Sequence, residues 1–211
     1  MTRPNVVSKH FQASLLPLFF ALTFFIQPAF GHHPFLMDES YQASVWQSFF
    51  SGIAHPLLGP DHLLFILGIA LVGLTKGQKS ILPLLAVGLG GSLLVQLQPL
   101  PDFLTAWAEA LVSLSLAIEG LIVLNLLSTK WLLPMFALHG YLLGSTIVGA
   151  EPSPLIGYFC GLLFVQGSLL LGVTSVSKKV AHRLLRAKDR ITLAGIWIGI
   201  GLAFSWVALI E

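Results

Sequence analysis

Long apolar runs separated by short polar segments are the feature that most limits how this chain of 211 residues folds. A helix needs about 20 mainly apolar residues to cross a bilayer core about 30 Å thick. Only 9% of the residues are charged, against about 25% in a soluble domain. We therefore expect an all-α membrane protein with about six transmembrane helices in a single polytopic domain. The apolar runs are 60–75, 81–97, 103–127, 131–150, 154–177 and 191–210.

The N-terminal segment has the pattern of a secretory signal peptide. A basic start is followed by an apolar stretch over 15–26 and by small residues up to Gly31. This order predicts a cleaved signal over 1–31, and the alternative is an uncleaved first helix. After cleavage the chain would begin with His32 and His33, whose imidazoles next to a free amine can chelate a transition metal ion. These two histidines are equally explained as a chance feature of the processing site.

Lysine and arginine lie in alternate connections between the apolar runs. Lys76, Lys79 and Lys130 follow the first and third runs, and six basic residues lie in 177–190 after the fifth. The segments 98–102 and 151–153 carry none. Because basic loops stay on the cytoplasmic side, we expect a multi-pass protein of the bacterial inner membrane with both mature termini outside.

The segment "GIAHPLLGPDHLLFILG", residues 52–68, places two histidines and an aspartate in an apolar run. The residue before a proline avoids the α conformation, so a first helix should end near His55. Pro60 suits the first turn of a new helix. In an unbroken helix, His55 and His62 would stand about 10 Å apart along the axis. A break between them is therefore the condition for both to bind one ion, since ligand atoms lie about 2 Å from a transition metal.

His55, Asp61 and His62 form the first candidate metal site. An ionisable group inside a membrane costs about 2.5–3.5 kcal/mol on insertion scales, so three within eight residues indicate a function. Imidazole and carboxylate together favour divalent nickel, cobalt, zinc, copper or iron, whereas Cu(I) prefers sulfur ligands. The alternative is that these histidines only pack and form hydrogen bonds.

Further polar residues lie inside later apolar runs. Counting the helix rise of about 1.5 Å per residue places Glu109 near the height of His62, and places His139 and Glu119 deeper. We therefore expect an outer capture site, followed by His139 further along an ion path. The glutamates are alternatively protonated and hydrogen-bonded between helices, and Glu151 at a loop edge either caps a helix or attracts cations. Gln96 and Gln166 are expected to form hydrogen bonds between helices.

Two stretches of the sequence resemble the HupE/UreJ family of nickel and cobalt permeases. "HPLLGPDHLLFILG" is similar to the family's signature, and "FALHGYLLGSTIVGAEPSPLIGY" is similar to its second motif. The resemblance covers the whole chain, and it implies Ni²⁺ or Co²⁺ as the transported ion, with a hydrogenase or urease as the metalloenzyme supplied. The residues alone imply only a divalent transition ion. The chain departs from the family where a further His or Glu often follows the His-Gly pair and Leu143, Ser145 and Thr146 stand here.

The leading interpretation is a secondary permease that imports the ion, without enzymatic activity and without a permanently bound cofactor. A phosphate-binding loop is absent from the sequence, so the chain has no ATP-binding motif of its own. The net charge of +2 gives no reason to expect nucleic acid, and the expected partners are the ion and membrane lipid, with a homo-oligomer left open. The alternatives are an electron-transfer protein that binds haem through histidines, a metal-delivery partner that does not transport, and, least favoured, an intramembrane metalloenzyme.

Overall fold

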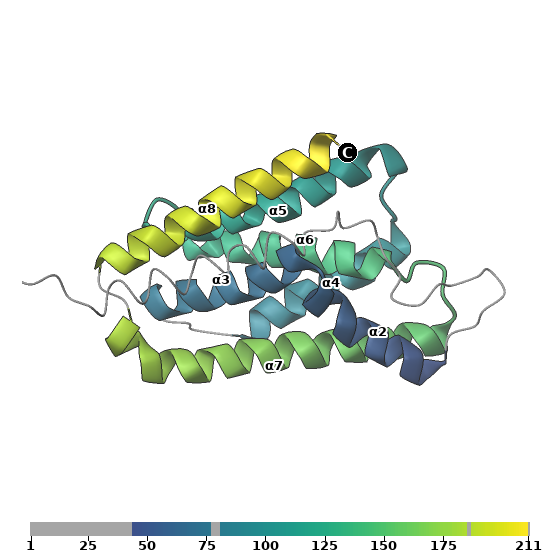
Figure 1. Ribbon diagram of the computed structural model, residues 1–211. Helices are drawn as coiled ribbons and strands as arrows, with labels where there is room; N and C mark the ends of the chain where they lie inside the picture. The colour runs from purple at the N-terminus through teal and green to yellow at the C-terminus, as the bar shows by residue number, and fades with distance from the viewer. Residues whose placement is uncertain (1–43, 77–80, 185–186, 211) are drawn as a thin grey trace, which may run out of the picture. The chain divides into compact units, whose positions relative to one another are not determined.

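The computed structural model describes residues 44–76, 81–184 and 187–210, which lie within the compact unit His33–Glu211 and are mostly helical (Figure 1). This described part contains no strand, which confirms the expected all-α class. The predicted signal peptide, His32 and His33 lie outside the described residues. Two short 3₁₀ helices, η1 and η2, precede α5 and α6. The elements are α2 Val45–Leu58, α3 Pro60–Lys76, α4 Leu82–Leu97, η1 Asp102–Leu104, α5 Thr105–Val123, η2 Thr129–Trp131, α6 Leu132–Ser145, α7 Pro152–Leu184 and α8 Ala187–Ile210.

Within the described residues, three continuous helical segments are long and apolar enough to cross a membrane: Asp102–Val123, Pro152–Gly172 and Lys188–Ile210. The bent pair α2 and α3 passes the same criteria as one broken span, which raises the number to four. The helices α4 and α6 have only 16 and 14 residues. Each predicted apolar run therefore corresponds to a helix, and the count of six spans stays a prediction.

The basic segment 177–190 was expected to be a loop, and this expectation was wrong for most of its length. The helix α7 continues to Leu184, and α8 already begins at Ala187. The segment contains no glycine or proline, and its Lys, Arg, Leu and Ala residues are good helix formers. The helix propensity of these residues therefore extends α7 and α8 into the basic segment.

The first span is broken, as predicted, but the break lies later than His55. The helix α2 runs through Pro56 to Leu58, and α3 begins at Pro60 with a bend of 72°. Pro56 lies in the last turn of α2, where a missing N–H removes only one hydrogen bond. The chain turns at Gly59, whose N–H donates to the carbonyl oxygen of His55 at 3.0 Å. Pro60 then starts the new helix, where its missing N–H is not needed.

Three helix pairs make the most extensive contacts: α2 with α7, α4 with α6, and α5 with α8. Each pair is closed by glycines whose absent side chains leave room for the facing backbone. A Cβ atom on Gly52 of α2 would overlap the carbonyl oxygen of Tyr158, and one on Gly140 of α6 would overlap that of Gly88. Close backbone contact of this kind is how helices associate where lipid removes the hydrophobic driving force.

Hydrogen bonds from polar side chains strengthen the α4–α6 pair. The hydroxyl of Ser92 donates to the carbonyl oxygen of Gly140 at 2.7 Å, and the amide of Gln96 donates to that of Gly144 at 2.8 Å. The predicted role of Gln96 between helices is confirmed. The pair thus fixes the position of α6, which carries His139.

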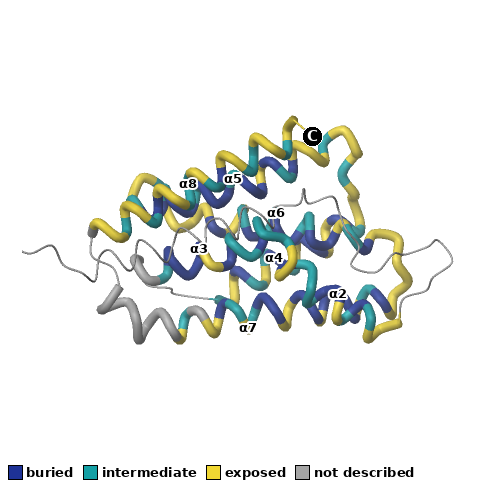
Figure 2. The backbone as a smooth tube through the Cα atoms, viewed as in Figure 1, coloured by how far each residue is buried: buried dark blue, intermediate teal, exposed yellow. Residues whose placement is uncertain are grey.

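Burial follows the helix pairing (Figure 2). The helix α3 packs against α5 and α7, and its residues 68–72 are buried without interruption. The apolar helix α8 is only 11% buried over its spanning window, so most of its surface faces outward. Cys160 on α7 is exposed.

Candidate metal site

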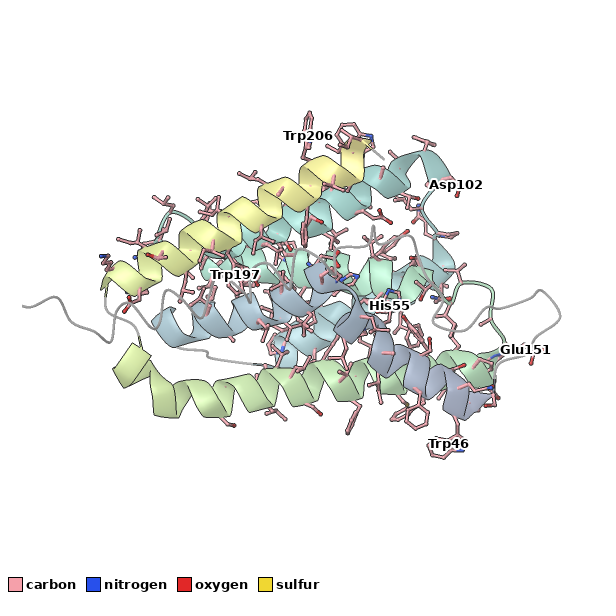
Figure 3. The ribbon with its side chains drawn as sticks, viewed as in Figure 1. Trp46, His55, Asp102, Glu151, Trp197 and Trp206 are labelled. Carbon is pink, nitrogen blue, oxygen red and sulfur yellow. The ribbon has the colours of Figure 1, made fainter. Side chains whose placement is uncertain are left out.

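The bend between α2 and α3 brings His55 and His62 close together. The two ring centroids are 5.8 Å apart with an interplanar angle of 67°. Figure 3 places His55 along the helices, away from the end where Trp46, Asp102 and Glu151 lie. Two imidazoles that bind one ion through nitrogens at about 2.1 Å have centroids about 5–6 Å apart. The observed spacing therefore allows a shared ion, which a continuous helix would not.

His62 begins a chain of hydrogen bonds that crosses three helices. Its Nδ1 lies 2.8 Å from Nδ1 of His139 on α6, and Nε2 of His139 lies 2.8 Å from the hydroxyl of Ser115 on α5. The Ser115 hydroxyl donates its own proton to the carbonyl oxygen of Val112. Ser115 must then accept from N–H at Nε2 of His139, which leaves Nδ1 of a neutral His139 as an acceptor. His62 consequently donates from Nδ1 and keeps its lone pair on Nε2.

His55 is oriented in the same way by residues of α6 and α7. Its Nδ1 lies 3.1 Å from the hydroxyl oxygen of Tyr158, and that hydroxyl donates to the carbonyl oxygen of Leu143 at 2.6 Å. Because the tyrosine proton is used by Leu143, the tyrosine oxygen accepts from N–H at Nδ1 of His55. In a neutral His55, Nε2 is therefore the nitrogen that carries the lone pair. Thr146 also lies within 3.0 Å of the Tyr158 hydroxyl.

Aromatic stacking holds the ring of His139 in place. The ring of Phe65 lies parallel to it, with centroids 3.8 Å apart and an interplanar angle of 9°. His139 is 2% exposed and His62 is 7% exposed, so the pair is shielded from bulk solvent. Packing and hydrogen bonds together fix the orientation of both rings.

The predicted carboxylates are distributed unevenly around this histidine cluster, which we define as His55, His62 and His139. Asp61 lies in the first turn of α3, and its Oδ1 and the ring of His62 both border the space above Gly59. Glu109 is half-buried on α5, and Glu151 is exposed before α7. In the described ranges, no three His, Cys, Asp or Glu side chains form a group that could hold a metal ion.

The contact between His62 and His139 corrects the order expected along the path. The sequence placed His139 deeper than His62, as a separate step. Their Nδ1 atoms are 2.8 Å apart, so the two side chains lie at one level. The expected order followed from counting residues along straight helices, whereas α2 and α3 are bent by 72° at their break.

Sequence reasoning missed the side chains that orient the histidines, namely Ser115, Tyr158 and Phe65. A tyrosine within an apolar helix is one usable signal, because a buried hydroxyl generally has a hydrogen-bond partner. The identity of that partner depends on residues far apart in the chain, such as His55 and Tyr158. Sequence spacing within one helix contains no information about such pairs.

Gly59 offers a steric test of the site. A Cβ atom there would stand 2.8 Å from Cδ2 of His62, closer than side chains normally approach. The backbone angles of Gly59, φ −78° and ψ 108°, suit alanine, so Gly59→Ala should insert normally. The ring of His62 must move, and we expect metal affinity to fall about tenfold. Equilibrium dialysis with Ni²⁺ measures this, and unchanged affinity would show that the His62 edge facing Gly59 does not bind the ion.

Comparison with known proteins places the chain in a family. Residues 20–204 match the family model described as HupE / UreJ protein. No curated protein and no solved structure matches the chain. The matched range includes every residue of the histidine cluster.

Proposed function

Because the chain belongs to the HupE/UreJ family, we propose that it is a secondary permease that imports a divalent transition metal ion, Ni²⁺ or Co²⁺, across the bacterial inner membrane. In this proposal both mature termini lie outside, and the ion enters at the histidine cluster. The imported metal would supply a metalloenzyme such as a hydrogenase or urease. The chain itself has no catalytic role.

The observation that carries this proposal is the anchoring of both histidines at the bend. His55 and His62 each donate from Nδ1 into a hydrogen-bond chain that ends on a backbone carbonyl oxygen. A metal-binding histidine typically donates its second N–H in this way, which fixes its tautomer and its orientation. Nε2 is the lone-pair nitrogen of each ring, and the ring spacing suits one ion. His139 thus orients His62, in place of the later step on the path expected from the sequence.

Two imidazoles give the ion a transition-metal preference but do not complete its coordination. Asp61 borders the same space above Gly59 and supplies negative charge to the incoming cation. The bend also leaves the last carbonyl groups of α2 without partners in the helix, and broken helices in transporters use such groups for cations. Water fills the remaining positions. Incomplete protein coordination suits a permease, since a transported ion must also leave its site.

The geometry argues against haem held by His62 and His139. Axial nitrogens on opposite sides of a haem iron stand about 4 Å apart, with the macrocycle between them. Nδ1 of His62 and Nδ1 of His139 are in direct hydrogen-bond contact at 2.8 Å, with no space for a macrocycle. A Soret band in the purified protein would favour the electron-transfer alternative.

Uptake of radioactive Ni²⁺ and Co²⁺ into proteoliposomes tests the proposed function. Purified protein should accelerate uptake over empty vesicles, and competition by Zn²⁺, Mn²⁺ and Fe²⁺ ranks the metals. Binding without uptake would instead identify a metal-delivery partner. Neither binding nor uptake of any of these ions would overturn the proposal.

A further inference from the structure

Glu119 is a buried acidic residue that lies outside the histidine cluster. Its exposed fraction is 0%, and neither of its carboxyl oxygens makes a hydrogen bond. An ionised carboxylate without a partner is strongly disfavoured in a medium that excludes water. The carboxyl group is therefore held in its neutral, protonated form in this conformation.

The carboxyl group of Glu119 and the indole of Trp197 lie next to each other at Gly68. A Cβ atom on Gly68 of α3 would overlap Oε2 of Glu119 and would lie 2.5 Å from Nε1 of Trp197 on α8. The indole N–H of Trp197 also lacks a hydrogen-bond partner (its ring is labelled in Figure 3). The indole of Trp197 interacts with the Glu119 carboxyl group, but the two form no hydrogen bond of normal geometry, which is rare for buried polar groups.

Glu119 on α5 and Gly68, the α3 residue next to it, both lie one to two helical turns beyond the residues of the histidine-cluster network. On α5 it follows Ser115 by four residues, which puts the two on one face and about 6 Å apart along the axis. On α3, Gly68 follows His62 by six residues, or about 9 Å. The residues between these positions carry no ionisable side chain. Moving away from the cluster along α5, or along α3 as far as Gly68, Glu119 is thus the first ionisable group reached.

Building on the proposed function, we propose that Glu119 is an inner binding position for the transported divalent cation, occupied by a proton in the present conformation. When the ion arrives, the carboxyl O–H bond breaks and a carboxylate oxygen binds the ion. The proton passes to water that accompanies the ion and leaves with it on the inner side. After the ion has left, the Glu119 carboxylate takes up a new proton from the outer side. The indole N–H of Trp197 can then donate to the carboxylate, so the unsatisfied donor stabilises the ionised form.

The charge needed to remove this proton must come from the ion itself. None of the ionisable groups on the helices packed against α5 makes a hydrogen bond with Glu119. The polar group that interacts with Glu119 is the neutral indole of Trp197. Among the described side chains, those ionisable groups are Asp61 and His62 on α3, His139 and Tyr141 on α6, Asp102 on η1, and Lys188, Asp189 and Arg190 at the start of α8.

Glu119→Gln tests the proposal because the amide keeps the size of the side chain and removes the carboxylate. The affinity of the histidine cluster for Ni²⁺, measured by equilibrium dialysis in detergent, should stay within about twofold, because the cluster is intact, while uptake into proteoliposomes should fall about tenfold or more. A pH-sensitive dye inside the vesicles should report acidification during uptake by wild-type protein and much less by the variant. Glu119→Asp keeps a carboxylate and should restore part of the uptake.

Trp197→Phe provides a second variant that retains a large ring and removes only the indole N–H. It should reduce uptake and acidification together, with Ni²⁺ binding retained. Wild-type uptake rates in both Glu119→Gln and Trp197→Phe would show that Glu119 is a packing residue and would overturn this inference alone. Absence of uptake by wild-type protein would overturn the proposed function as well.

Discussion

Replacing His62 with alanine should remove Ni²⁺ binding and uptake together, with a loss of affinity of about 100-fold or more. His62 lies in the first turn of α3, directly after the bend, and begins the hydrogen-bond chain to His139 and Ser115. His62→Gln is the sharper variant, since its amide can still donate to Nδ1 of His139 but offers no imidazole nitrogen to an ion. Equilibrium dialysis and proteoliposome uptake measure both effects.

The matched control for His62 is Gln166→Ala, a change at another buried polar side chain on a different helix. Gln166 lies on α7 and is 5% exposed, outside the histidine cluster. This variant should keep most of the uptake. Near-normal uptake by well-inserted His62→Gln would refute the assignment of the ion to His62.

Gly140→Ala should destabilise the protein by about 3 kcal/mol and reduce uptake. A Cβ atom on Gly140 would overlap the carbonyl oxygen of Gly88, and backbone atoms cannot move aside as a flexible side chain can. The helices α4 and α6 must separate, which weakens the hydrogen bond from Ser92. His139 directly precedes Gly140, so its contact with His62 is also lost. Thermal unfolding in detergent measures the stability change.

Gly90→Ala on α4 is the control for this prediction. No atom lies within 4 Å of a Cβ atom at Gly90, so alanine fits without displacement. Alanine also favours a helix over glycine by about 1 kcal/mol, and stability should be unchanged or higher. If both variants unfold at the wild-type temperature, close contact of α4 and α6 does not determine stability.

Some features of this protein were determined by its sequence alone. Apolar runs interrupted by short polar segments specified an all-α membrane fold, because local composition decides which segments form helices. The order His55, Pro56, Gly59, Pro60 predicted a break, since proline removes a backbone donor and restricts the residue before it. The break itself lies later than the sequence indicated: α2 continues to Leu58 because a proline in the last turn costs a helix little.

The arrangement of side chains around the ion site was decided only by the tertiary structure. His62 meets His139, and His55 meets Tyr158, although each pair is far apart in the chain. These contacts depend on the bend after α2 and on glycines that let backbones touch, and neither the angle nor the pairing follows from periodicity within one helix. For the same physical reason, the unsatisfied acid at Glu119 became recognisable only once α3, α5 and α8 were placed together.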